Sequence, residues 1–190
     1  MTDGQDDRIA KWLADAAQGD ENAWRLIVSE FSPRIFGLLK AQCRDADLAE
    51  ELTQSVFVTL AEKLGEYTEQ GQFQSWIFRV AINRLRDEMR RRTRHAKPTS
   101  QETLSEIEGV ADGDGYRTIE REQILSLEQA MDELSSSDRE IVDLRHTAGL
   151  SFKQIASLLN EPVGTLLARH HRALARLRES IERIQKRASK

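Results

Sequence analysis

The stretch SFKQIASLLNEPVGTLLARHHRALARLR, residues 151–178, contains two helical patterns separated by a short turn. Ser151 stands before a short amphipathic run and fits a helix N-cap. Asn160, Glu161 and Pro162 form a predicted turn, and Gly164 is small enough for a crossing helix to come close. We expect the longer second helix to bury the following apolar residues: Val163, Leu166, Ala173, Leu174, Leu177, Ile181 and Ile184. This order is that of a helix-turn-helix unit.

The outward face of the second helix is polar and basic. Thr165, Arg169, Arg172 and Arg176 follow one another at steps of four, three and four, which places them on one side of a helix. Arginine binds phosphate or pairs bidentately with guanine, so this face is predicted to enter a major groove. Arg145, just before the motif, is predicted to touch the DNA backbone. The plainer interpretation is a solvated basic face on an ordinary helical hairpin.

The remainder of the chain also favours helices. Gly and Pro number only 10 and 3 in 190 residues, and alternating β-branched runs are scarce. We expect helices over residues 7–18, from Asp20 through Leu38 with a bend or break at Pro33, over 47–64, and over 75–94 with Ser75 as N-cap. A polar loop is expected at 66–74. In the third of these helices, one apolar stripe is expected, formed by Leu48, Leu52, Val56, Leu60 and Leu64. The predicted fold class is all-α.

The helical patterns fall into two groups. Residues 95–117 are polar and acidic and include Pro98, Gly109, Gly113 and Gly115, a composition typical of a flexible linker. The chain is therefore predicted to contain two small helical domains, residues 7–94 and 118–186, joined by an acidic linker at 95–117.

Charge is distributed unevenly along the sequence. The formal net charge is −4, but residues 71–100 carry eight basic and two acidic side chains, and residues 144–190 carry ten and three. In the helix expected at 75–94, one face holds Arg79, Asn83, Arg86, Arg90 and Arg94, and Arg91 and Arg92 add further charge. Two basic blocks separated by acidic ones indicate two phosphate-binding surfaces.

Several classes of function lack support in the sequence. The single cysteine, Cys43, forms no internal disulfide and is expected to be a small buried residue. The polar N-terminus resembles no signal peptide and no apolar run spans a membrane, so a cytoplasmic protein without membrane insertion is expected. No metal site is predicted, since His170 and His171 diverge on a helix while His95 and His146 lie far away. Without a phosphate loop or nucleophile motif, no cofactor and no enzyme activity are expected.

Three collinear segments resemble one protein family. Residues 151–178 resemble a promoter-binding C-terminal domain, QSWIFRVAIN at 74–83 resembles a promoter-opening helix, and AEELTQSVF at 49–57 resembles a polymerase-docking segment. Together they resemble the bacterial sigma-70 family, in its small extracytoplasmic-function (ECF) type. The resemblance implies an alternative sigma factor that binds core RNA polymerase and directs promoter-specific transcription initiation, recognising the −10 and −35 elements and helping to melt promoter DNA.

The resemblance also implies roles for particular residues. Residues 7–94 correspond to sigma region 2, and residues 118–186 to region 4. Glu50, Glu51 and Gln54 would dock on a coiled coil of the largest polymerase subunit, and the polymerase flap is a second expected contact. The downstream element would be bound by Tyr67, Arg79, Asn83, Arg86, Arg90, Arg91 and Arg92. The upstream element would be bound by Arg145, Thr165, Arg169, Arg172 and Arg176. The family commonly has an anti-sigma partner, which the sequence neither requires nor excludes.

The sequence departs from the family pattern in two places. Leu167 and Ala168 replace a basic residue and a serine, which puts the affinity for the upstream element in doubt. Leu48 and Ser55 stand where acids are usual in the docking segment. One hypothesis is that phosphorylation of Ser55 or Thr53 restores the missing charge. Equal polymerase binding by Ser55→Ala and Ser55→Glu would contradict it, and the plainer interpretation is that Glu50 and Glu51 suffice.

Three other classes of protein stay open at this point. A dimeric operator-binding regulator would need residues 7–94 to act as a sensor or dimerisation domain, and it would not bind core polymerase without DNA. An enzyme would need convergent catalytic groups, which the spacing of His and carboxylate residues does not supply. An interaction module that titrates another regulator is compatible with the sigma reading.

Overall fold

The computed structural model describes residues 3–68, 71–95 and 115–188, and within these ranges it contains helices and no strand. The first group is α1 (Asp3–Ala17), α2 (Glu21–Cys43), α3 (Ala46–Lys63), the 3₁₀ turn η1 (Leu64–Glu66) and α4 (Phe73–His95). The second is α5 (Gly115–Asp132), α6 (Ser136–Val142), the π-helical η2 (Asp143–Thr147), α7 (Phe152–Leu159) and α8 (Val163–Ala188). The all-α prediction is confirmed. Most of the predicted linker, 95–117, lies outside the described residues.

Side-chain caps fix where several helices begin. Asp20 accepts hydrogen bonds from the backbone N–H groups of Asn22 and Ala23, at 2.7 and 3.3 Å, as predicted. Ser151 accepts from the backbone N–H of Gln154 at 3.3 Å, and the Gln154 side chain accepts from the backbone N–H of Ser151 at 2.8 Å. This reciprocal capping box pins the start of α7 and hence the orientation of the helix-turn-helix.

Two predictions about helix boundaries were wrong. Of the bend or break predicted at Pro33, the break does not occur, because α2 continues through it, and the bend stays a prediction. Pro33 and Ser29 are exposed, so water can bond the carbonyl that the proline ring leaves unpaired, while buried Phe31 and Ile35 hold the helix on both sides. Ser75 is not an N-cap but lies inside α4, where it is buried and donates from its hydroxyl to the carbonyl of Gln154 at 3.4 Å.

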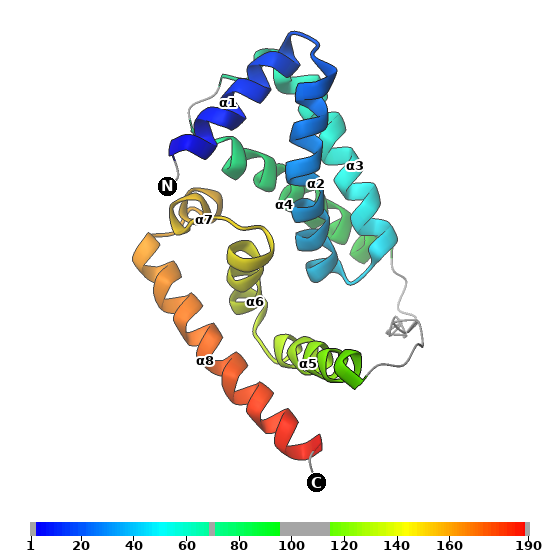
Figure 1. Cartoon of the computed structure of the whole chain (residues 1–190), viewed down its shortest axis with the longest axis vertical. Helices are drawn as coiled ribbons and strands as arrows, with labels where there is room; N and C mark the ends of the chain where they lie inside the picture. The colour runs from blue at the N-terminus through cyan, green and yellow to red at the C-terminus, as the bar shows by residue number, and fades with distance from the viewer. Residues whose placement is uncertain (1–2, 69–70, 96–114, 189–190) are drawn as a thin grey trace.

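The first four helices enclose the larger part of the core (Figure 1). Phe31 of α2 and Phe78 of α4 are fully buried at its centre. The predicted α3 stripe is confirmed, since Leu48, Leu52, Val56, Leu60 and Leu64 are all buried. Burying large apolar side chains at about 1.5–3 kcal/mol each fixes α4 against α2 and α3, so that its opposite face is displayed.

In the second group, the long α8 packs on α5, α6 and α7 (Figure 1). A small cluster joins α5, α6 and α8 through buried Ala130, Leu134, Val142, Ala173 and Leu177. Three predictions for α8 were wrong. Val163 and Leu174 are 37% and 39% exposed rather than inward, whereas Leu166 and Ala173 beside them are buried. No atom would lie within 4 Å of a Cβ at Gly164, so no close helix crossing occurs there.

The two groups of helices pack against each other. Helix α7 contacts α4, and η2 contacts α2, bringing segments far apart in the sequence side by side (Figure 1). The core of the first group is continuous with buried Leu144, Ala148, Leu150 and Ile155 of the second. The helix-turn-helix is thereby placed over one side of α4.

Candidate nucleic-acid interface

Helix α4 presents the predicted basic side chains along one exposed face. We call Arg79, Asn83, Arg86, Arg90 and Arg94 the outer face of α4; all five side chains are exposed. Ile77, Phe78 and Ala81 on the opposite side are buried, which explains why the cations point outward. Two of these cations already contact the second group of helices, since Arg79 donates to the carbonyl of Ser157 at 2.5 Å and Arg86 pairs with Glu140 at 3.0 Å.

Acids from the same chain pair with the cations near the end of α4. Arg91 donates to both oxygens of Glu88, at 2.7 and 3.0 Å, and Arg92 donates to Glu88 at 3.1 Å and to Asp45 at 3.0 Å. The hydrogen bond from Arg91 holds the pKa of Glu88 below its usual range. Arg90 lies 3.6 Å from Asp87. Exposed ion pairs of this kind contribute little free energy, so a phosphate can replace the acid.

An aromatic cluster lies at the start of α4. The ring of Tyr67 lies 5.4 Å from that of Trp76 and 5.8 Å from that of Phe73, measured between centroids. Tyr67 and Trp76 are half-buried, whereas Phe73 is buried against Phe31. The cluster therefore offers partly exposed aromatic surface next to the outer face of α4, the kind of surface on which unpaired bases stack.

The outer face of α8, formed by Thr165, Arg169, Arg172 and Arg176, is only partly available. Arg169 makes a bidentate pair with Glu161 at 2.6 and 3.0 Å, which raises the pKa of Arg169 and leaves its side chain 19% exposed. Arg176 donates to Asp138 at 2.5 Å. Thr165 and Arg172 are exposed, and Arg172 has no ion pair or hydrogen bond within the described part of the chain.

Arg145 is held inside the second group of helices. It donates to the backbone carbonyl of Leu150 at 2.9 Å, and its guanidinium lies 5.4 Å from the centroid of the Phe152 ring. The side chain thus supports the turn before α7, where Gly149 adopts a left-handed φ of 69°. Its predicted phosphate contact stays a prediction.

The fold brings together His146 and His170, which lie far apart in the sequence. The Nε2 atoms of His146 and His170 lie 2.9 Å apart, and their rings stack with centroids 5.1 Å apart. Desolvation lowers the pKa of His170, with further lowering from His146, Arg145 and His171. His171 is exposed. Across the described residues, no three His, Cys, Asp or Glu side chains form a group that could hold a metal ion.

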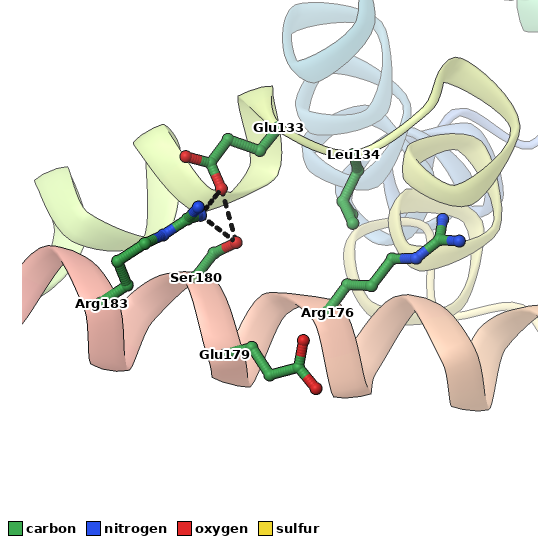
Figure 2. Close-up of a pocket in the computed structure, with 6 residues that line it drawn as sticks. All are labelled: Glu133, Leu134, Arg176, Glu179, Ser180 and Arg183. Carbon is green, nitrogen blue, oxygen red and sulfur yellow. Dashed lines mark hydrogen bonds and ion pairs between the residues drawn. The ribbon is translucent and has the colours of Figure 1, made fainter.

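A polar hollow of about 370 Å³ lies between the end of α5 and α8 (Figure 2). Ser180 donates to Glu133 at 2.5 Å, and Arg183 forms an ion pair with the same carboxylate. Figure 2 shows both side chains directed at Glu133. The hydrogen bond from Ser180 is the main cause of the lowered pKa of Glu133. These contacts join α8 to α5 beside Arg176, the last cation on the outer face of α8.

The predicted docking residues are exposed on α3. Glu50, Glu51 and Gln54 face solvent, and the Gln54 amide donates to Glu50 at 3.4 Å. Val58, one turn beyond Gln54, is 57% exposed, although an apolar residue in an amphipathic helix is normally assigned to the core. Figure 1 shows α3 on the side away from α7 and α8.

The two candidate phosphorylation positions differ in access. Thr53 is buried, and its hydroxyl donates to the carbonyl of Ala49 at 2.6 Å. A kinase could reach Thr53 only after local unfolding of α3. Ser55 is half-buried, so the hypothesis of a restoring phosphate now rests on Ser55 alone.

Both basic helix faces lie in segments that match known protein families. The model of sigma-70 region 2 matches residues 27–95, and that of sigma-70 region 4 matches residues 124–177. The chain belongs to the sigma-70 family, in its ECF class. The match to region 2 covers all of α4, and the match to region 4 covers α7 and α8 as far as Leu177.

Curated relatives match this sigma factor over nearly its whole length. RNA polymerase sigma-H factor of Pseudomonas aeruginosa is 28% identical, over 96% of this chain and 95% of its own. RNA polymerase sigma factor CarQ of Myxococcus xanthus is 28% identical, over 88% and 94%. The ECF sigma-E factor of Escherichia coli is 25% identical, over 87% of each chain. The protein is thus an alternative sigma factor that directs promoter-specific transcription, in a family of initiation factors rather than catalysts.

Solved structures share the fold. CnrH, in complex with the cytosolic domain of CnrY, superposes with a TM-score of 0.66 at 19% identity, over 92% of this chain and 97% of its own. RpoE of Bartonella quintana, in complex with the anti-sigma factor NepR, superposes with a TM-score of 0.62 at 21% identity, over 84% and 96%. Within the described ranges, no helix is both long and apolar enough to cross a bilayer.

Proposed function

We propose that this sigma factor binds the downstream promoter element through the outer face of α4 and the upstream element through the outer face of α8. The observation that carries the proposal is the presence of two separate basic helix faces in one chain, each fixed by its own buried stripe. In this proposal residues 7–94 act as region 2 and residues 118–186 as region 4.

Strand separation at the downstream element is assigned to the start of α4. Tyr67 and Trp76 supply partly exposed rings on which a flipped base can stack, and Asn83 supplies an exposed amide two turns further along the helix. Arg79, Arg86 and the cations that follow hold the phosphates of the same strand. Melting therefore needs no catalytic group in the sigma factor, and we propose no enzyme activity.

Arg172 is an exposed cation on the outer face of α8 that has no ion pair within the described part of the chain, and its removal tests the upstream assignment. Arg172→Ala is expected to weaken binding to an upstream-element duplex and to reduce the slope of log K against log salt by about 0.9, one phosphate contact. Arg178→Ala removes the same charge from another side of α8 and is the matched control. Equal losses in both variants, measured by fluorescence anisotropy, would place the DNA on a different face.

Polymerase docking is assigned to the acids of α3. Reversing both charges, with Glu50→Lys and Glu51→Lys, is expected to weaken binding to core polymerase by more than about tenfold, since like charges would face a basic coiled coil. The control reverses Glu21 and Glu66, which are also exposed in the first group of helices. Titration of labelled sigma factor with core polymerase, without DNA, provides the measurement. Unchanged affinity would show that the acids only solvate the helix.

Cellular context follows from the same assignments. A factor that binds core polymerase works in the cytoplasm, and we propose that location. CnrH and RpoE were solved with a bound protein partner. We propose that a partner of the anti-sigma class also binds this chain.

Transcription in vitro tests the proposed function as a whole. Purified protein, core polymerase and fragmented genomic DNA are expected to yield discrete transcript starts that share two upstream elements at fixed spacing. Transcription lost together with polymerase binding would favour the operator-binding regulator instead.

A further inference from the structure

The first turns of α8 carry no charged side chain. Residues 163–168 read VGTLLA, and the residue that follows them, Arg169, is paired with Glu161. In a helix-turn-helix, the N-terminal part of the second helix is the part that contacts base edges. The part of α8 that is placed to read bases is therefore apolar, apart from the hydroxyl of Thr165.

Two apolar side chains of this segment face solvent. Leu167 is 46% exposed and Ala168 is exposed, whereas Leu166 beside them is fully buried. One turn earlier, no atom would lie within 4 Å of a Cβ added at Gly164, so the space in front of the first turn is open. We call Gly164, Leu167 and Ala168 the apolar strip of α8. Figure 1 shows α8 at the edge of the molecule, with α5, α6 and α7 packed on one side of it.

A cation stands beside the apolar strip rather than within it. Arg172, exposed and without an ion pair in the described part of the chain, lies one turn beyond Ala168. A helix in the major groove meets base edges along its centre and phosphates at the rims of the groove. With Arg172 at a phosphate, the apolar strip lies against the bases.

The major groove offers such a strip one apolar group. Base edges present hydrogen-bond donors and acceptors there, and thymine adds its C5-methyl group. Leu167 has no donor or acceptor for guanine, adenine or cytosine, so pressing it against their polar edges would remove water without replacing the lost hydrogen bonds. Contact with a thymine methyl group instead removes apolar surface of both partners from water, which is favourable.

We propose that Leu167 and Ala168 read thymine in the upstream promoter element, through contact with its C5-methyl group. This inference rests on the role proposed for α8 and adds to it the identity of a base. The upstream element of this sigma factor is then expected to contain at least one thymine whose methyl group contributes to binding.

Deoxyuridine tests the contact directly, because it lacks only the C5-methyl group and keeps the base pairing of thymine. Mapping of transcript starts first identifies a promoter and its upstream element. Each thymine of that element is then replaced in turn by deoxyuridine in a fluorescein-labelled promoter duplex, and binding of the holoenzyme is followed by anisotropy. We expect at least one replacement to weaken binding by the unaltered protein about fourfold, the effect of losing one buried methyl group.

Two variants connect the effect to the apolar strip. Leu167→Ala shortens an exposed side chain to one that favours helix, so the fold should be kept, and circular dichroism checks this. We expect this variant to bind the thymine and deoxyuridine duplexes with less than about a twofold difference. Leu127→Ala is the matched control, because Leu127 is also 46% exposed but lies in α5, outside the helix-turn-helix. It should keep the fourfold difference.

Two results would overturn the proposal. An upstream element without thymine, or equal binding of every deoxyuridine duplex by the unaltered protein, would show that no methyl group is read. An undiminished difference in Leu167→Ala would show that another residue reads it, and weaker binding of that variant to core polymerase without DNA would then make the apolar strip a polymerase contact. If the holoenzyme binds a scrambled upstream element as tightly as the original, the failure lies in the role of α8, and the thymine contact falls with it.

Discussion

An Asp143→Asn variant is expected to be more stable than the unaltered protein near neutral pH, by up to about 3 kcal/mol. Asp143 lies in η2, is 2% exposed, and has one carboxylate oxygen without a hydrogen-bond partner in the described structure. Desolvation is the main cause that raises its pKa from 3.8 to about 6, with the charge of Arg139 opposing the shift. An ionised, poorly bonded carboxylate in this position destabilises the folded state.

The sign of the pH dependence follows from the raised pKa. Because the folded state holds the Asp143 proton more tightly than the unfolded state does, the protonated carboxyl favours folding below about pH 4. That contribution is lost as pH rises through about 6, and it does not change further above that value. Asparagine does not titrate, so the advantage of the variant should be large at pH 7.5 and small at about pH 4.

Thermal unfolding followed by circular dichroism measures this difference. Each kcal/mol of added stability raises the midpoint temperature of unfolding by roughly 2–4 °C for a chain of this size. Asp87→Asn removes the same charge at an exposed site on α4 and should change the midpoint little at any pH. A lower midpoint for Asp143→Asn at pH 7.5 would mean that Arg139 stabilises the buried carboxylate more than desolvation destabilises it.

Local patterns predicted the helices and their caps well. The α3 stripe and the caps at Asp20 and Ser151 depend on residues within a few positions of one another, and they appear as expected. The errors at Pro33 and Ser75 have a different origin. In both places burial of neighbouring side chains outweighed a local preference for a break or a cap.

The direction of the basic faces was predictable, but what those faces contact was not. Spacing alone places the arginines of α4 and α8 on one side of each helix. The partners Ser157, Glu140 and Asp138 lie 78, 54 and 38 positions away from Arg79, Arg86 and Arg176. The same holds for Arg34 and Ala148, which are 114 positions apart. Contacts at such separations depend on how the helices pack against one another, within a group or between the two groups, which no local pattern encodes.

A variant with Arg79, Arg86 and Arg90 all changed to Gln is expected to show the largest loss of DNA binding. Each lost contact to a single strand should reduce the salt slope of binding by about 0.7, so the three together remove about 2. The variant loses affinity relative to the unaltered protein, and a slope change of about 2 makes this loss about a hundredfold larger when the salt concentration is ten times lower. Transcription should fall most steeply at low salt, where the unaltered protein gains most from its cations.

The salt slope separates contacts to DNA from contacts within the chain. Loss of Arg79 and Arg86 also removes the hydrogen bond to Ser157 and the ion pair with Glu140, which join the two groups of helices. Loss of such contacts changes the absolute affinity, whereas the slope counts the phosphates that are neutralised. The slope is therefore the quantity to compare between variants.

The salt slope is measured on a holoenzyme of core polymerase and each sigma variant. The holoenzyme is titrated with the non-template strand of a promoter that has been mapped by transcription. Changing the exposed cations Lys11, Arg25 and Lys63 to Gln lowers the net charge equally but leaves α4 intact, and this control should keep the original slope. If both triple variants lose slope equally, the field of the whole protein rather than α4 attracts the strand. A loss confined to the α4 variant would assign the phosphate contacts to Arg79, Arg86 and Arg90 and make α4 the downstream-element helix.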